Sequence, residues 1–358
     1  MAEDDRVKQA CAYLRLLLLR PGEYRSRWTG TGPDAVSGHE GFSGQQTASV
    51  ADSGSGTGSG SGTVSGPGTI DGSGTVSGSD TIAGSDTVSG AGTESSDIDY
   101  AAVAAVLDDG EPGAGHVDVD TVRRALTGTE LSPATLDRFI EAFGLTGRHA
   151  NRLRDVLRGS AATRVITGDA LLPAELYQSS GPPGYETLAM HEMHTLGPDG
   201  RPAEHQTIQV IRSTVDRLDS YPYRFDTNEL TVEVTRGGRV GQRIYRMSES
   251  LYAVDILLTR PLAKGESSLM QYHTTFFYRS QPPAEFRRGL ARATRDVSIW
   301  VTFHPQRLPK RIWSASWDGL DQGRILERES VELDEQRSVH RRFDVVERAI
   351  VGFYWEWT

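Results

Sequence analysis

The chain has 358 residues, of which 38 are basic and 48 are acidic, so its formal net charge is −10. Twelve of the acids, and no lysine or arginine, fall within residues 31–116, so the rest of the chain has 38 basic and 36 acidic residues, a net of +2. The overall acidity therefore does not exclude a nucleic-acid partner. The single cysteine, Cys11, excludes an intramolecular disulfide.

Residues 6–19 predict an amphipathic helix, because their apolar residues recur at helical spacing with Cys11 on the apolar side. Pro21 and Gly22 are expected to end it. The first residues lack the basic-then-apolar order of a secretion signal, and the leucine-rich run from Leu14 to Leu19 is too short to span a bilayer. We therefore expect a cytoplasmic protein with no membrane partner, in keeping with the single cysteine.

Residues 31–95 form a tract rich in Gly, Ser, Thr and Asp, and residues 60–95 repeat a hexad that opens on glycine and has threonine in fourth place. Two interpretations remain open for this repeat. Hexapeptide repeats can wind a parallel β-helix. Six hexads would give only about two coils, however, too few to bury a core. A disordered acidic insert over 31–95 is the favoured interpretation.

Residues 96–159 predict a second group of helices, which with residues 1–30 would form one helical domain. The first helix, from Asp97 to Leu107, begins on an aspartate cap. The second runs from Val117 to Leu126 and ends at Gly128, a left-handed cap. Ser132 and Pro133 open the third, and residues 147–158 form the last.

From Tyr185 onward the pattern changes to short segments rich in Val, Ile, Thr and aromatic residues, separated by turn residues. About eight or nine such segments without intervening helices predict a sandwich or a barrel. The favoured interpretation is a β-sandwich-like domain over 180–358, joined by a linker over 160–179. Residues 283–294 are the exception and predict a short helix or a basic loop. The predicted fold class is α+β multidomain: a helix-turn-helix-like helical bundle interrupted by a low-complexity acidic insert, then a mainly-β domain.

The stretch "TVRRALTGTELSPATLDRFIEAFGL", residues 121–145, resembles the Xre-type (lambda-repressor-like) helix-turn-helix family. The match consists of a helix, a glycine, a loop, "SP" and a helix that closes on "FGL". The strand-rich tail with "GPDGRPAEHQTIQVIR" and "YPYRFDT" looks like actinobacterial proteins labelled as regulators of this type. In this family the helix before the glycine enters the DNA major groove. The resemblance therefore implies that Thr121, Arg123, Arg124 and Thr127 contact double-stranded DNA.

These residue types suit that role, because arginine reads guanine through a two-pronged contact and threonine contacts phosphate or a thymine methyl. The function predicted is a DNA-binding transcriptional regulator whose C-terminal domain senses a small-molecule or protein ligand or mediates assembly. The alternative is a non-enzymatic ligand- or protein-binding module whose helical head does not bind DNA. Asp118 and Asp120 at the start of the helix, and a net charge of only +1 over residues 117–158, favour that alternative.

A second basic group lies in "FRRGLARATR" and "HPQRLPKR", where it is a candidate for contact with an anion or a nucleic-acid backbone, or a pair of solvated loops. Its members are Arg287, Arg288, Arg292, Arg295, Arg307, Lys310 and Arg311.

The segments "HEMH" and "YPYRFDT" are two further candidate sites. His191 and His194 are three apart on a predicted strand and should point to opposite faces, which disfavours a metal site. Tyr221 and Tyr223 could line a ligand pocket, but a buried strand corner is favoured. No nucleophile with its base stands out in the sequence. We therefore predict no enzyme activity, no metal and no cofactor.

Overall fold

The computed structural model describes residues 3–20, 22–30, 98–109, 116–159, 163–167, 184–227, 229–247, 251–290, 292–319 and 323–358. The hexad repeat over 60–95 lies outside the described residues, so the two interpretations of it remain predictions. The described residues before position 31 and after position 97 belong to one compact unit. Their fold class is α+β, with helices first and strands after, as the sequence predicts.

Six helices occur among the described residues: α1 (Glu3–Leu19), α2 (Glu23–Thr29), α3 (Tyr100–Asp109), α4 (Val119–Thr127), α5 (Pro133–Ala142) and α6 (Gly147–Arg158). The helix α2 was not predicted, because its seven residues are too few to show a period and follow a Pro-Gly pair. It is held by Trp28, whose indole donates to the Leu18 carbonyl at 3.0 Å. None of the described helices has the length and apolar character needed to cross a membrane.

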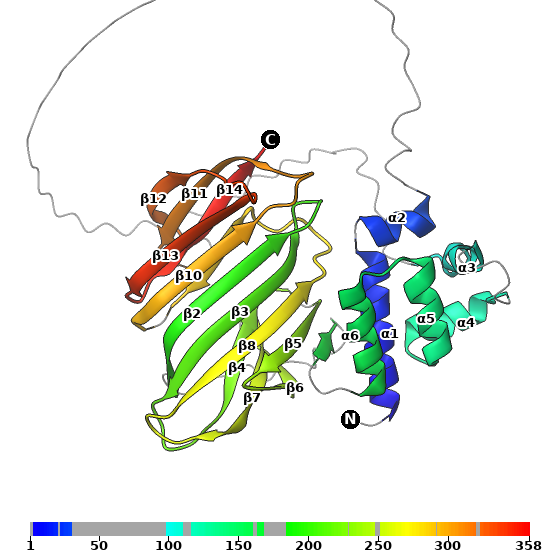
Figure 1. Ribbon diagram of the computed structural model, residues 1–358, viewed down its shortest axis with the longest axis horizontal. Helices are drawn as coiled ribbons and strands as arrows, with labels where there is room; N and C mark the ends of the chain where they lie inside the picture. The colour runs from blue at the N-terminus through cyan, green and yellow to red at the C-terminus, as the bar shows by residue number, and fades with distance from the viewer. Residues whose placement is uncertain are drawn as a thin grey trace, which may run out of the picture. The chain divides into compact units, whose positions relative to one another are not determined.

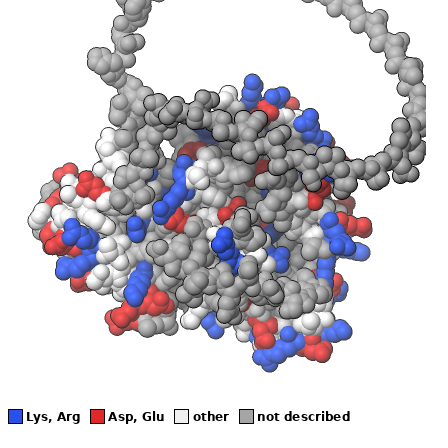
Figure 2. Space-filling model, turned by 180° about the vertical axis from the view of Figure 1, so that it is seen from behind, with Lys and Arg blue, Asp and Glu red and all other residues white. Residues whose placement is uncertain are grey.

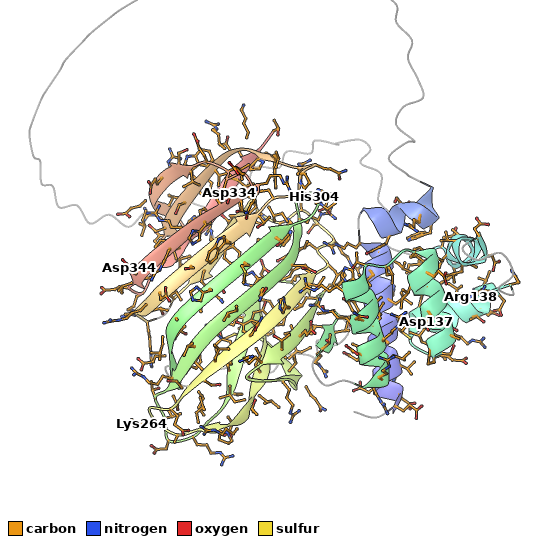
Figure 3. All side chains as sticks on the ribbon, in the orientation of Figure 1. Asp137, Arg138, Lys264, His304, Asp334 and Asp344 are labelled. Atoms are coloured by element: carbon orange, nitrogen blue, oxygen red, sulfur yellow. The ribbon has the colours of Figure 1, made fainter. Side chains whose placement is uncertain are left out.

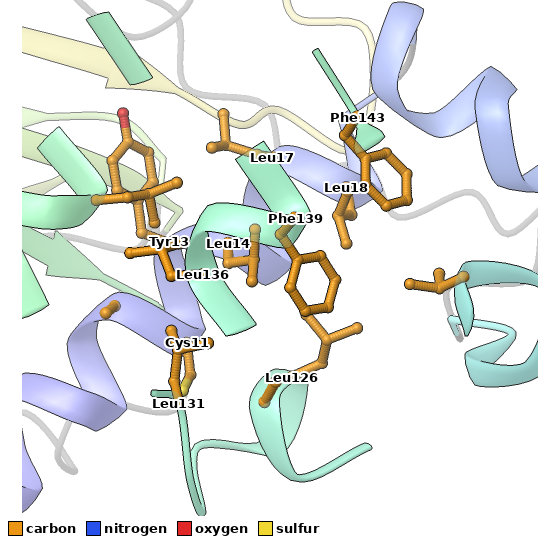
Figure 4. Packing of buried hydrophobic residues seen from close by; sticks show 14 of the residues in the cluster. Cys11, Tyr13, Leu14, Leu17, Leu18, Leu126, Leu131, Leu136, Phe139 and Phe143 are labelled. Atoms are coloured by element: carbon orange, nitrogen blue, oxygen red, sulfur yellow. The ribbon is translucent and has the colours of Figure 1, made fainter. Parts of the chain in front are cut away.

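The helices share one apolar core. Leu14 and Leu17 of α1 pack with Phe139 and Phe143, which come from the far side of the 31–97 segment in sequence (Figure 4). Cys11 is 1% exposed in this core, and burial is the main reason why the pKa of its thiol rises to about 12. Cys11 is therefore a packing residue, as its position on the apolar stripe predicts.

Side-chain caps fix where the helices begin. Ser132 accepts the Thr135 amide at 3.0 Å, and Gly128 ends α4 with φ 88°, which confirms both predicted signals. The helix α3 starts later than predicted. Asp99, rather than Asp97, accepts the amides of the second and third helical residues at 3.0 Å each.

Fourteen strands follow among the described residues: β1 (Thr163–Ile166), β2 (Tyr185–Leu196), β3 (Pro202–Ser213), β4 (Leu218–Phe225), β5 (Leu230–Arg236), β6 (Gly238–Arg246), β7 (Tyr252–Leu262), β8 (Ser267–Phe276), β9 (Glu285–Gly289), β10 (Thr294–Thr302), β11 (Pro309–Trp317), β12 (Ile325–Val331), β13 (Ser338–Val346) and β14 (Ile350–Trp357). They form a seven-stranded sheet of order β1-β5-β8-β3-β2-β10-β13 and two smaller sheets, β12-β11-β14-β9 and β4-β7-β6 (Figure 1).

Both smaller sheets pack on the same face of the large sheet, which gives the sandwich-like arrangement. Tyr272 of β8 pairs with Thr207 of β3, which pairs with Glu192 of β2, which pairs with Ile299 of β10. Tyr272 and Ile299 therefore point to the same, inner face of the large sheet. Tyr272 packs in the core under β4-β7-β6, and Ile299 in the core under the four-stranded sheet. On the opposite, outer face, Val165 of β1 joins the helical core. The strand β1 lies within the range predicted as a linker, where four residues are too few to show a period.

The prediction of a short helix or basic loop over 283–294 is wrong for residues 285–289, which form β9. This strand pairs antiparallel with β14, from Phe286 opposite Phe353 to Gly289 opposite Ile350. In β9 the side chains of Phe286 and Arg288 point inward, and those of Glu285 and Arg287 point outward. Because an arginine stands on each face, the sequence does not show the usual alternation of apolar and polar residues. Gly352 permits this close pairing, because a Cβ there would lie 1.9 Å from the Phe286 carbonyl oxygen.

Candidate functional site

The helix α4 carries the four predicted DNA contacts. Its inner side, Val122, Ala125 and Leu126, is buried against the other helices. The side chains of Arg123 and Arg124 are 55% and 49% exposed on the outer side. The structure thus places the two predicted base readers together on an accessible helix surface, as the period of the sequence predicts.

Each of these arginines has an acidic partner. Arg123 donates to Asp120 at 3.0 Å and also lies 5.6 Å from the centre of the Tyr100 ring. The Nε of Arg124 lies 3.5 Å from a Glu130 oxygen. Exposed pairs of this kind are weak and exchange readily with another anion. A phosphate or a base edge would therefore compete with Asp120 and Glu130 for the two guanidinium groups.

The two threonines are engaged in local hydrogen bonds. The Thr121 hydroxyl donates to Asp118 at 2.9 Å and accepts from Arg124 at 3.2 Å. The Thr127 hydroxyl donates to the Arg123 carbonyl at 2.8 Å. Asp118 also accepts the Thr121 amide, and this backbone hydrogen bond is the main reason why the pKa of its carboxyl is lowered. Thr121 therefore serves first as a part of the helix cap, with its amide and hydroxyl both bound to Asp118.

Two arginines of α6 pair with acidic residues of the sheet and are therefore not free cations. Arg152 is 4% exposed, donates to Thr275 at 2.7 Å and pairs with Glu233 at 2.6 Å. Arg148 pairs with Glu204 and contacts the His273 ring nitrogen at 2.8 Å. The net charge of +1 counted over 117–158 thus overstates the charge available to DNA.

A third α6 arginine is bound within the helical part. Arg154 donates twice to Asp137 of α5, at 2.8 and 3.0 Å, and Asp137 is labelled in Figure 3 beside Arg138. Among the described residues on the face that Figure 2 shows, basic and acidic side chains are intermixed.

The basic residues after position 283 do not form one patch. Strand alternation sends Arg287 and Arg288 to opposite faces of β9. Arg287 donates to Glu285 at 2.7 Å and lies 4.8 Å from the Trp317 ring centre. Arg288 points inward and pairs with Glu192. Neighbours in sequence thus belong to two different environments.

The other basic residues after position 283 also lie apart from one another. Arg311 pairs with Glu356 and lies beside Trp313, Arg307 lies 5.1 Å from the Trp357 ring centre, and Lys310 and Arg295 are exposed. Arg292 lines a separate hollow together with Glu347 and Arg348. The structure therefore does not assemble these residues into the single anion-binding group that their spacing suggested.

The sequence did not reveal a polar seam on the inner face of the large sheet, between its two apolar cores. We use this name for Glu192, His194, His205, Gln209, Tyr272 and Arg288. Glu192 is fully buried and lies 3.5 Å from His205. Burial alone raises the pKa of Glu192, but Arg288, with help from His205, outweighs it and holds the pKa at about 2. The seam therefore contains a buried carboxylate.

Several atoms of the seam have no hydrogen-bond partner among the described residues. They are one Glu192 oxygen, both ring nitrogens of His194, the His205 Nδ1, both amide atoms of Gln209, the Tyr272 hydroxyl and the Arg288 Nε. His194 packs against Phe286, 4.7 Å between ring centres, and burial lowers its pKa to about 3. Buried polar groups without partners cost free energy of folding and are where proteins hold ordered water or polar ligands.

The alternation in "HEMH" was the signal available in the sequence. His194 is buried, whereas His191 on the opposite face is half-exposed and lies 3.7 Å from Asp296, which confirms the predicted orientation of the two histidines. The segment "YPYRFDT" likewise contributes Tyr221 and Tyr223 to an apolar core, as a buried strand. No group of metal-ligating side chains is found among the described residues.

Comparisons with known proteins leave the family open. No family model matches the chain, and no curated protein matches it. Among solved structures, a candidate protease from Parabacteroides distasonis aligns with 48% of this chain and 40% of its own, at 9% identity and a TM-score of 0.32. An M1 zinc metallopeptidase from Deinococcus radiodurans aligns with 48% and 43%, at 15% identity and a TM-score of 0.26. The chain thus spans about two fifths of the length of these proteins.

Proposed function

We propose that the chain is a cytoplasmic, non-enzymatic transcriptional regulator of the Xre type, which reads double-stranded DNA with α4. The observation that carries the proposal is the geometry of α4. Its inner side is buried, both ends are capped, and Arg123 and Arg124 project together from the accessible side. A recognition helix needs this division between a packed side and a polar side.

The test is a selection of binding sites from random duplex DNA with the full-length protein, at two salt concentrations. An enriched sequence that persists at higher salt is the expected result, since base contacts depend less on salt than phosphate contacts do. Arg123→Ala and Arg124→Ala should each relax the preference at one base pair, with a loss of about 10-fold or more in affinity. Arg217→Ala is the matched control, because Arg217 is another exposed arginine paired with an aspartate. The proposal fails if no sequence is enriched.

The acidic partners of the two arginines give a second, opposite prediction. Asp120→Asn and Glu130→Gln should each tighten DNA binding at low salt, by up to about fivefold, because an exposed ion pair of ordinary strength no longer competes. Binding isotherms measured by fluorescence anisotropy would show the gain, which should shrink as salt screens the lost charges. An affinity unchanged by both substitutions would mean that DNA does not approach this side of α4.

The second candidate function is a ligand- or protein-binding module without DNA binding. The observation that favours it is the use of α6 arginines within the molecule, where Arg148 and Arg152 bind the sheet. Under this alternative the helical part serves to cover the outer face of the sheet. Arg123→Ala and Arg124→Ala would then leave every binding property of the protein unchanged.

A further inference from the structure

Two connections of the β-sandwich flank a hollow of about 560 Å³ that is open to solvent. One connection joins β9 to β10 and the other joins β13 to β14; they lie together because Thr294 pairs with Val346 and Gly289 with Ile350. The hollow is lined by Arg292, Ala293, Glu347 and Arg348. Its volume is that of a small-molecule site, and two arginines against one glutamate give the lining a net charge of +1.

The backbone of Arg348 is unusual for an arginine. Its φ is 44°, in the left-handed region that glycine and asparagine adopt with least strain. No hydrogen bond or ion pair of its side chain occurs among the described residues. The turn thus keeps a strained arginine that contributes nothing visible to the stability of the fold. Backbone strain of this kind is enriched at ligand-binding sites, although turns such as that of Arg337 also contain it.

Arg292 is fixed on the other side of the hollow. One of its terminal nitrogens donates to the Tyr185 carbonyl at 3.2 Å, which orients the guanidinium and leaves other N–H groups for a ligand.

We propose that this hollow binds a small molecule with a phosphate or carboxylate group, held between Arg292 and Arg348. Two guanidinium groups that approach from different connections offer the paired N–H donors that an oxyanion accepts. Glu347, on the same lining, would accept a hydroxyl or amino group of the ligand. The site is separate from α4, so its occupancy does not depend on whether α4 binds DNA.

The test is the thermal unfolding midpoint of the full chain with glycerol 3-phosphate, glycerate or glycerol, each at the same ionic strength. One of the two acids should raise the midpoint by about 3 °C at ten times its dissociation constant, and glycerol should not. The larger response between the two acids identifies the oxyanion. An unchanged midpoint with both acids overturns the proposal.

Two glycine variants separate binding from folding. Arg348→Gly should abolish the response while the midpoint without ligand stays equal or rises, because glycine relieves the left-handed backbone. Arg337→Gly is the matched control. Arg337 is also an exposed arginine with positive φ, 61°, but it lies in the turn between β12 and β13 and should keep the full response. A full response in Arg348→Gly would overturn the assignment.

Discussion

Arg288→Met should lower the free energy of unfolding by about 3–5 kcal/mol, the usual cost of removing one partner from a buried ion pair. Its partner Glu192 is fully buried, and without Arg288 its carboxylate would remain in the interior with only neutral or weakly placed partners, the His205 ring and the Thr207 hydroxyl, each at 3.5 Å. The pKa of Glu192, held at about 2 with Arg288 present, should then rise. Denaturant unfolding followed by tryptophan fluorescence measures the loss.

A double-mutant cycle distinguishes a lost ion pair from lost packing. Glu192→Leu combined with Arg288→Met removes both charges and should recover most of the stability lost in Arg288→Met, because apolar replacements of buried pairs are often neutral. If the losses of unfolding free energy in the two single variants simply add up in the double variant, the ion pair does not explain the loss in Arg288→Met. Arg341→Met is the matched control: Arg341 pairs with Glu329 on the surface, so its removal should cost less than about 1 kcal/mol.

Acid should destabilise the protein well before its carboxylates titrate. Burial lowers the pKa of His194 to about 3, and burial, with Arg20, Arg152 and Arg148, lowers that of His149 to about 4. Both folded-state values lie below the unfolded value of 6.5. Below pH 6.5 the unfolded chain therefore binds protons that the folded chain does not. Each histidine should then remove about 1.4 kcal/mol per pH unit, so the two together remove about 4 kcal/mol between pH 7 and pH 5.

Unfolding by urea at several pH values measures this slope. His194→Phe, which keeps a ring against Phe286, and His149→Asn, which keeps a side chain able to bond Tyr13, should each reduce the slope by about one proton. Equal slopes in the parent and both variants would show that these histidines do not set the acid limit. Below pH 4.5 Glu192 adds to the loss, because its stabilising effect disappears as the pH falls toward its lowered pKa.

The periodic elements could be predicted from the sequence, since burial on one side imposes a spacing that the residues display. Helix α5, with Ser132 and Pro133 at its start, is one example, and the alternating strand β3 is another. Short elements could not be predicted. The seven residues of α2 and the five of β9 gain their stability from packing and pairing with distant segments, which leaves little local pattern.

Of the candidate sites, likewise, one could be predicted from local spacing and the others could not. The accessible side of α4 follows from helical spacing, so Arg123 and Arg124 could be placed together. The polar seam could not be predicted, because Glu192 and Arg288 are 96 residues apart and meet only through sheet packing. The basic group after position 283 was misleading for a related reason. Adjacent arginines in a strand point to opposite faces, so closeness in sequence did not become closeness in space.

The single thiol has a consequence for how the motions of this protein can be followed. Cys11 lies in the helical core, which also contains Phe277 from the strand-rich part of the chain. With its pKa near 12, this thiol reacts with an alkylating reagent only when the core opens and exposes it. The alkylation rate therefore reports the opening equilibrium of the helical part. Comparison with amide exchange in the strands shows whether helices and sheet open as one cooperative unit or in sequence.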